Sequence, residues 1–323
     1  MEKKELRIVY MGTPDFAVES LNALVKGGFN VVGVVTMPDK PAGRGYKLQH
    51  SPVKEYALAH DLPLLQPEKL KDENFIAALR EWKADLQIVV AFRMLPEVVW
   101  NMPALGTFNL HASLLPQYRG AAPINWAVIN GDLETGVTTF FLTHEIDTGK
   151  IIRQKRVAIS DKDDAGTVHD VLMKIGADLV IETVDSVLSG SVDTVSQESL
   201  FADVSDLRPA PKIFKDTCRI DWNKQVADIY NFIRGLAPYP AAWAELVSPD
   251  GDRVALKIFQ SEKIIASHKL KSGTLLSDGK TYIDIAVPDG YLRLLSVQLA
   301  GKKRMPVSAF LNGFNLTGQF LVE

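Results

Sequence analysis

The chain has 323 residues, of which 46% are hydrophobic and 23% are charged, and its formal net charge is −3, as in a folded protein with a large core. Its apolar runs are too short to cross a bilayer, its first residues lack the apolar segment of a secretory signal, and its single cysteine, Cys218, excludes an intrachain disulfide and a cysteine-rich metal site. We therefore expect a cytoplasmic protein with two domains and no membrane partner.

Short apolar runs alternate with helical patterns over the first part of the chain. The pattern predicts strands at Leu6–Met11, Asn30–Thr36, Leu86–Phe92 and Thr107–His111, with helices at Phe16–Lys26 and Asn74–Trp82. Such alternation favours an α/β domain whose sheet is mostly parallel. Ligands of open sheets of this kind bind at the carboxyl ends of the strands, so the residues at those ends are the first candidates for a site.

The middle of the chain adds two strands, a long helix and a polar segment. Val137–Leu142 and Lys150–Ile159 are predicted to be antiparallel strands joined by a turn, and Thr167–Leu188 has the spacing of a helix. Residues 190–208 are rich in Ser, Asp and Thr and poor in apolar residues, as is typical of a linker.

The last third changes character after Pro211. Trp222–Leu236 is predicted to be helical. Five short β-like runs follow, separated by hairpin-type turns, at Ala242–Val247, Val254–Ser261, Gly273–Ser277, Thr281–Val287 and Tyr291–Leu299. This arrangement predicts a small all-β barrel.

Two polar side chains stand two residues apart in the strand at Thr107–His111. Alternate residues of a strand point to one face, so Asn109 and His111 should project together while Phe108 and Leu110 pack on the other side. An amide donor beside an imidazole suits a reaction that builds charge on a carbonyl oxygen. The alternative is a core strand whose Asn and His bond to backbone groups.

A third polar group follows in the turn Asp147-Thr148-Gly149. A carboxylate near an imidazole orients the ring and favours its charged form, so Asp147 could complete a trio with Asn109 and His111. The alternative is that Asp147 only stabilises its own turn. Metal-ligand spacings of the His-x-x-x-His or Cys-x-x-Cys type are absent from the sequence, so we expect no metal site.

Basic segments point to a nucleic-acid partner. A glycine-rich loop around Arg44 carries several cations after the second predicted strand, and a basic tetrad from Gly301 to Arg304 follows the last barrel run. From Arg208 onward, 16 Lys and Arg stand against 11 Asp and Glu, so this part is basic on an otherwise acidic chain. Ordinary variation of surface charge is the alternative for each of these segments.

The chain resembles a known family through motifs spread over nearly its whole length. The matching segments are Gly12–Ala17, Pro38–Gly45, Ser51–Lys54, Asn109–Pro116, Arg119–Ile124, Asp147–Gly149, Arg219–Trp222 and Ala300–Lys303. The Asn-x-His pair with Asp-Thr-Gly alone marks the broad formyltransferase superfamily. The Arg44 loop and the C-terminal segments narrow the resemblance to the methionyl-tRNA formyltransferases.

This resemblance implies a fold and an activity. It implies a Rossmann-like α/β formyltransferase domain at 1–189, a linker at 190–208 and an OB-like, tRNA-binding β-barrel at 209–323. The implied reaction moves the formyl group of 10-formyltetrahydrofolate to the α-amino group of methionyl initiator tRNA, for translation initiation. The implied enzyme acts as a monomer without a metal.

The resemblance also implies roles for particular residues. The positions of Asn109, His111 and Asp147 match the catalytic trio. The segment implied to contact the folate is Ser113, Leu114, Leu115 and Pro116. The residues implied to contact the tRNA are Arg44, Lys302 and Lys303.

The sequence departs from the family pattern beside the expected folate pocket. Arg93 stands where the family has a glycine, in a loop one residue shorter than usual. Two other functions stay open: a related formyltransferase that acts on an amino sugar or a glycinamide nucleotide, and a nucleic-acid-binding module without catalysis. The second would have no need for the Asn109, His111 and Asp147 set.

Overall fold

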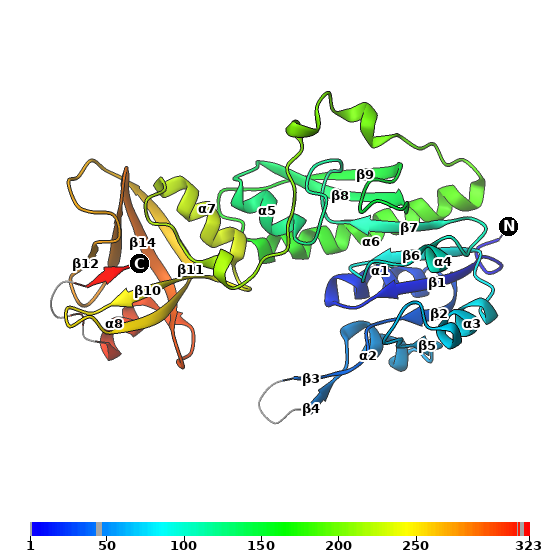
Figure 1. Cartoon of the computed structure of the whole chain (residues 1–323), viewed down its shortest axis with the longest axis horizontal. Coiled ribbons are helices and arrows are strands. Elements are labelled where there is room, and N and C mark those ends of the chain that lie inside the picture. Colours follow the sequence, from blue (N-terminus) through cyan, green and yellow to red (C-terminus); the bar gives the residue numbers. More distant parts are fainter. Residues whose placement is uncertain (1, 43–46, 315, 317–319) are drawn as a thin grey trace. The chain divides into compact units, whose positions relative to one another are not determined.

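The computed structural model of the chain describes residues 2–42, 47–314, 316 and 320–323 (Figure 1). It divides into two compact units. The first consists of Met1–Gly120, Thr135–Val157 and His169–Ala210, and the second of Ala121–Glu134, Ala158–Val168 and Pro211–Glu323. The second unit thus also takes in two short segments that precede residue 169, and the domain bounds expected from the sequence stay predictions.

The first unit is built on a seven-stranded sheet with the order β5-β2-β1-β6-β7-β8-β9. Its strands are β1 (Arg7–Gly12), β2 (Asn30–Val35), β5 (Leu64–Leu65), β6 (Leu86–Val90), β7 (Thr107–His111), β8 (Glu134–Phe141) and β9 (Ile151–Ala158). The pairs from β5 through β7 are parallel, and β7 pairs antiparallel with β8. The predicted mostly parallel α/β sheet is therefore confirmed.

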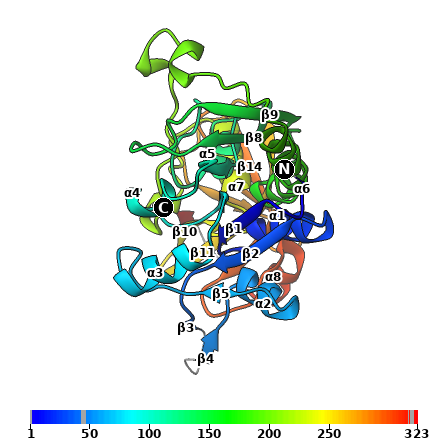
Figure 2. The same ribbon diagram turned by 90° about the vertical axis from the view of Figure 1, so that its right-hand side faces the viewer.

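Helices cover the sheet because its strands are apolar on both faces. They are α1 (Asp15–Lys26), α2 (Pro52–Ala59), α3 (Glu73–Glu81), α4 (Glu97–Trp100) and α6 (Ala165–Ser189), and a short hairpin of β3 (Lys40–Ala42) and β4 (Lys47–Gln49) stands apart from the sheet. Figure 2 shows the sheet and these helices from a second direction.

The strand register decides which side chains share a face. Leu110 stands opposite Val90, and α6 approaches it so closely that a Cβ on Gly176 would lie 2.8 Å from the Leu110 side chain. Asn109 stands opposite Val89, on the other face. There Val89 packs in a cluster with Phe75 and Leu79 of α3 and Val99 of α4. Asn109 and His111 therefore project from the face that α6 does not cover.

The second unit is an antiparallel, nearly closed barrel with the strand order β12-β13-β14-β11-β10-β16. Its strands are β10 (Ala242–Val247), β11 (Arg253–Ile265), β12 (Leu275–Ser277), β13 (Ile283–Val287), β14 (Gly290–Leu299), β15 (Met305–Pro306) and β16 (Leu321–Val322). A bridge between Thr274 and Leu321 links the two ends of the order, and β15 pairs with β14. The predicted C-terminal barrel is confirmed.

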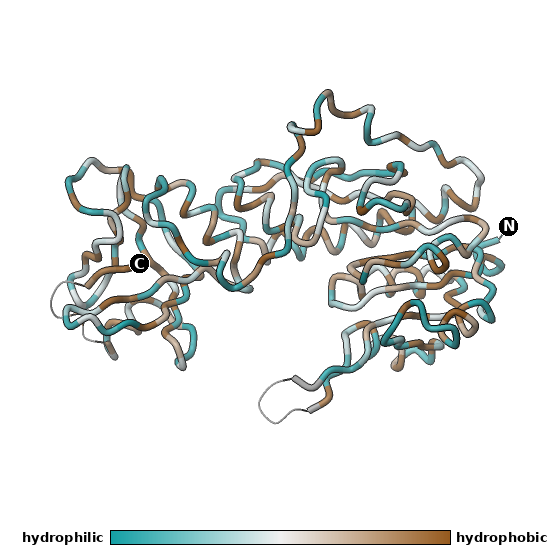
Figure 3. The backbone as a smooth tube through the Cα atoms, viewed as in Figure 1, coloured by the Kyte–Doolittle hydropathy of each residue, from teal (hydrophilic) through white to brown (hydrophobic). Residues whose placement is uncertain are grey.

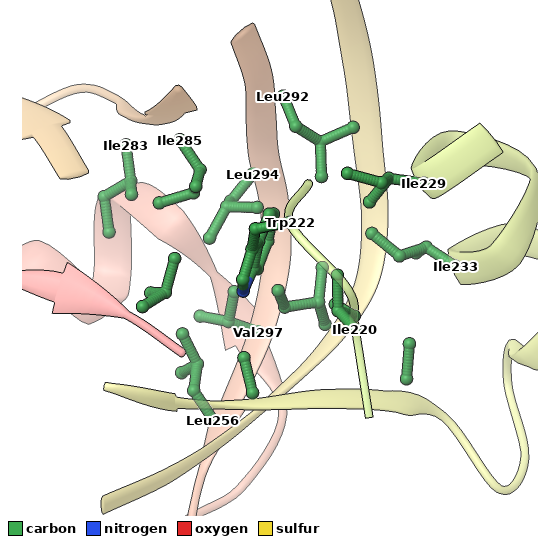
Figure 4. Packing of buried hydrophobic residues seen from close by; sticks show 14 of the residues in the cluster. Ile220, Trp222, Ile229, Ile233, Leu256, Ile283, Ile285, Leu292, Leu294 and Val297 are labelled. Carbon is green, nitrogen blue, oxygen red and sulfur yellow. The ribbon is translucent and has the colours of Figure 1, made fainter. Parts of the chain in front are cut away.

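Helices α5 (Pro123–Ile129), α7 (Val226–Leu236) and α8 (Val307–Gly313) complete this unit, and α7 packs its apolar face on the barrel core (Figure 4). The helix predicted from Trp222 begins only at Val226. Ile220 pairs through its N–H with the carbonyl of Trp243, which keeps the preceding segment extended. Trp222 is buried in the core from this extended segment, so its apolar character signalled burial rather than helix.

Hydrophobic residues gather along the strands and many loops are hydrophilic (Figure 3). Within the described ranges, no helix combines the length and the apolar character needed to span a membrane. Over the same residues, no three His, Cys, Asp or Glu side chains come together as metal ligands would.

Candidate active site

The site lies at the carboxyl end of β7, where this strand presents His111. The ring is 6% exposed, and its Nε2 lies 2.9 Å from the carbonyl oxygen of Tyr118. Because a carbonyl only accepts hydrogen bonds, Nε2 carries the hydrogen in this contact. The other ring nitrogen, Nδ1, is then the one that can take or give a proton, and it lies 3.9 Å from Oδ2 of Asp147.

Asp147 is brought to His111 by the turn that follows β8. Its φ is +56°, in the left-handed region, which aspartate tolerates better than most residues. The N–H of Gly120 donates a hydrogen bond of 2.9 Å to Oδ2, the same oxygen that faces the imidazole. The carboxylate is mostly buried, so its charge acts on the ring with little screening by water.

One short loop, residues 118–120, therefore holds both ionisable groups of the site. Its first residue accepts from His111 and its last donates to Asp147. The loop is itself tied to the end of the linker, because Tyr118 donates to the carbonyl of Arg208 and Ala210 donates to the carbonyl of Arg119. A Cβ on Gly120 would lie 2.5 Å from the carbonyl oxygen of Ala210, so this close approach requires glycine.

The last residue of the Asp147-Thr148-Gly149 turn yields a stability prediction. A Cβ on Gly149 would lie 1.6 Å from the carbonyl oxygen of Phe141, and backbone cannot move aside as a flexible side chain can. We expect Gly149→Ala to destabilise the protein by about 1–3 kcal/mol or more, measured as a lower Tm in calorimetry. Gly313→Ala is the matched control, because a Cβ there meets no atom of the described residues within 4 Å. An unchanged Tm for Gly149→Ala would contradict this geometry.

Asn109 shares the face of His111 and is half-buried. Its Oδ1 is buried and has no hydrogen-bond partner among the described residues. Thr13 Oγ1, just after β1, and Arg93 Nε, just after β6, are buried without a partner in the same sense. Because β1, β6 and β7 are neighbours, these three atoms sit along one carboxyl edge of the sheet. Unpartnered buried polar atoms cost free energy, and their gathering at this edge marks it as a place for a polar ligand.

Arg93 is held at this edge of the sheet by hydrogen bonds of its guanidinium. Its two terminal nitrogens donate to the carbonyl oxygens of Pro67 and Glu68, at 2.6 and 2.9 Å. Partial burial lowers the pKa of Arg93 from its ordinary value, although the group stays charged at neutral pH. Arg93 thus ties the β6 loop to the segment before α3.

The segment Ser113–Pro116, expected to contact folate, is mostly buried. Ser113 donates to the carbonyl of Gln117 and Leu115 packs in a core cluster with Phe140 and Ile151. The carbonyl of Leu115 accepts from Gln154. These polar groups are paired within the protein, and a folate contact of the segment stays a prediction.

The residues expected to contact tRNA lie elsewhere. Arg44 falls outside the described residues. The loop that carries it starts from a base where Asp39 accepts from Lys54 at 2.5 Å and from Gln66 at 2.9 Å, and these hydrogen bonds lower the pKa of Asp39. Lys302 and Lys303 are exposed in the second unit, on the turn between β14 and β15.

The structure adds a residue that the sequence analysis did not find. Gln197 has no exposed surface, and its side chain bonds to the backbone of the Asp147 turn. It lies in the polar segment 190–208, where a glutamine among serines and aspartates carries no pattern that distinguishes it from a solvated residue. Only the fold reveals it.

Taken together, these groups can stabilise negative charge and move a proton. Asn109 offers an amide and His111 offers Nδ1 on one face, and the carboxylate of Asp147 lies 3.9 Å from Nδ1. This arrangement fits the attack of a nucleophile on a carbonyl carbon, where charge develops on the oxygen.

Comparisons with known proteins agree with this chemistry. Residues 6–184 match the protein family described as "Formyl transferase", and residues 212–315 match the family described as "Formyl transferase, C-terminal domain". Methionyl-tRNA formyltransferase of Bacteroides thetaiotaomicron is 70% identical over 98% of each chain, and that of Flavobacterium johnsoniae is 53% identical over 99% of each chain.

The fold has counterparts among solved structures. The sugar 3N-formyl transferase WlaRD superposes with a TM-score of 0.64, covering 92% of this chain and 99% of that one, at 20% identity, which speaks for the fold alone. Together, the matches over both parts of the sequence and the relatives that are similar along its whole length show that the chain belongs to the methionyl-tRNA formyltransferase family.

Proposed function

We propose that this protein transfers the formyl group of 10-formyltetrahydrofolate to the α-amino group of methionyl initiator tRNA, for translation initiation. The observation that carries the proposal is the convergence of Asn109, His111 and Asp147 at the carboxyl end of β7. The identity of 70% with a relative named methionyl-tRNA formyltransferase supports the choice of substrates.

The reaction follows from the groups in the site. The amine nitrogen of methionyl-tRNA attacks the formyl carbon, a C–N bond forms, and the carbonyl electron pair moves to oxygen. The Asn109 amide and protonated His111 stabilise this oxyanion through hydrogen bonds. The bond from the formyl carbon to N10 of the folate then breaks as the carbonyl re-forms and His111 Nδ1 gives its proton to N10, and the neutral ring then takes up the proton that the amine loses. The Asp147 carboxylate, 3.9 Å from Nδ1, orients the ring for both transfers.

The carboxyl edge of the sheet fits the folate co-substrate. Three unpartnered groups there are available to a polar ring system. They are the hydroxyl of Thr13, the Nε donor of Arg93 and the Oδ1 acceptor of Asn109. We propose that Ser113, Leu114, Leu115 and Pro116, which follow the carboxyl end of β7, border the folate at this edge.

The tRNA would bind through basic side chains outside the folate site. We propose that Arg44 approaches the acceptor end and that Lys302 and Lys303 contact the phosphate backbone. In this proposal the enzyme works as a monomer in the cytoplasm, where charged tRNA is made and used.

Phosphate contacts give a testable dependence on salt. We expect the logarithm of the tRNA affinity to fall linearly with the logarithm of salt concentration, by about 0.7–0.9 per phosphate contact. Lys302→Ala/Lys303→Ala should flatten this slope by about 1–2, measured by filter binding. The charge-matched control Lys69→Ala/Lys71→Ala, on exposed lysines of the first unit, should leave it unchanged. Equal slopes for the wild type and the Lys302/Lys303 variant would remove these two residues from the interface.

An acceptor competition tests the proposed function against its alternative. The wild type is given formyl donor and equal amounts of methionyl initiator tRNA, an amino-sugar nucleotide and glycinamide ribonucleotide. We expect formyl groups on the tRNA alone. Formylation of either small amine in preference to the tRNA would support the related formyltransferase, and tRNA binding without any product would support a module without catalysis.

A further inference from the structure

The polar segment after α6 contains one completely buried side chain, that of Gln197. Its neighbours Glu198, Ser199 and Leu200 are exposed, although all four residues form the short helix η1 (Gln197–Leu200). A long polar side chain loses rotamer freedom and hydration on burial, and hydrogen bonds made inside the protein are needed to offset this cost.

All four hydrogen-bonding positions of the Gln197 amide are used. Nε2 donates to the carbonyl oxygens of Asp147, at 2.9 Å, and of Gly149, at 2.8 Å. Oε1 accepts from Nε and Nη2 of Arg119, at 3.0 and 2.7 Å. A reversed amide would set oxygen against the two carbonyls and nitrogen against the guanidinium, so the contacts define its orientation.

These contacts join the segments that carry the site. The carbonyls belong to the turn of Asp147, and Arg119 stands between Tyr118, which accepts from His111, and Gly120, which donates to Asp147. The rest of the Asp147 turn, from Thr143 to Ile146, is exposed; Thr143 bonds within the turn, and His144 contacts Glu97 and Trp100 of α4. These contacts hold exposed side chains, whereas the buried Gln197 amide bonds directly to the backbone carbonyl of Asp147.

We propose that Gln197 is a positioning residue for formyl transfer. It holds the Asp147 turn so that the carboxylate stays against Nδ1 of His111, and through Arg119 it couples this turn to the loop of residues 118–120. The linker thereby contributes to the active site without touching substrate. This inference rests on the proposed function and on the role that it gives to Asp147.

A displaced catalytic group changes the rate of the chemical step more than the binding of substrates. A misplacement of about 1 Å can lower a rate about 100-fold. We therefore expect Gln197→Met, which keeps the length of the side chain and removes its amide, to lower kcat by about 10- to 100-fold. The KM values for folate and for methionyl-tRNA should change by less than about threefold.

A double-mutant cycle separates positioning from general damage. Asn tolerates the left-handed conformation at position 147, so Asp147→Asn keeps the turn and removes the working carboxylate. If Gln197 acts through Asp147, adding Gln197→Met to Asp147→Asn should lower kcat by less than about threefold further. An effect of full size in both backgrounds would mean that Gln197 acts only on the structure and would overturn the proposal.

Two further variants complete the test. Gln197→Glu keeps an acceptor for Arg119 and loses the donors to Asp147 and Gly149, so it should show the same loss of kcat, and it replaces Gln197→Met if that variant does not fold. Ser199→Ala, in the same short helix, is the matched control and should keep wild-type kcat. Wild-type kcat in a folded Gln197 variant, or a loss confined to KM, would overturn the inference. A wild-type enzyme that forms no formylmethionyl-tRNA would instead overturn the proposed function itself.

Discussion

Replacing His111 by alanine is expected to lower kcat for formyl transfer by about 100- to 10,000-fold, the range for removal of a general acid–base group. The Tyr118 carbonyl occupies Nε2, so Nδ1 is the ring nitrogen left for the reaction, and alanine supplies no substitute. The affinity for methionyl-tRNA should stay within about threefold of the wild type, because His111 contributes to the transition state rather than to tRNA binding.

His60 provides a matched control for this substitution. It also makes a ring-nitrogen contact with a backbone carbonyl, that of Tyr56 at 2.9 Å, but it lies exposed at the end of α2. His60→Ala should keep kcat within about twofold of the wild type. Single-turnover kinetics with saturating substrates measure the chemical step directly in both variants. A folded His111→Ala enzyme with wild-type kcat would contradict the proposed mechanism.

Replacing Asn109 by alanine is expected to lower kcat by about 100- to 1,000-fold, the loss found when one oxyanion donor is removed. Among the described residues Asn109 Oδ1 has no hydrogen-bond partner, so alanine breaks no hydrogen bond of this oxygen to the described part of the chain. Asn109→Asp has nearly the same shape but places a carboxylate where negative charge develops, and it should be at least as slow as the alanine variant.

Asn101 at the end of α4 is the control for Asn109, because it is exposed and precedes the amino end of β7, whereas the site lies at the carboxyl end. Asn101→Ala should retain wild-type kcat in the same single-turnover experiment. A Tm for Asn109→Ala close to that of the wild type would show that the loss is catalytic. If Asn109→Asp were as fast as the wild type, the oxyanion role of Asn109 would be wrong.

The parts of the fold that follow from burial could be predicted from the sequence. The strand at Thr107–His111 matches β7 residue for residue, because a buried strand between turns leaves a short apolar run. Short elements, such as the β3–β4 hairpin and helix α2, are not predicted from the sequence, because so few residues show too little periodicity. At Trp222 the predicted helix is too long, because an apolar residue in the extended segment before α7 fits the helical spacing.

The candidate site divides in the same way. The alternation of a strand put Asn109 and His111 on one face, and the structure agrees. The approach of Asp147 to His111, and its support by Gly120 and Gln197, depend on contacts between segments 27 to 50 residues apart. Local patterns carry no record of such contacts. The catalytic roles of these residues stay predictions until they are measured.

One measurement tests the central claim most directly. The wild-type protein is incubated with methionyl initiator tRNA and 10-formyltetrahydrofolate labelled in the formyl carbon, and the aminoacyl group is released and identified by mass spectrometry. The account predicts label on the α-amino nitrogen of methionine, with an equal amount of tetrahydrofolate formed. Unlabelled methionine after complete incubation, from a folded enzyme that binds both substrates, would contradict it.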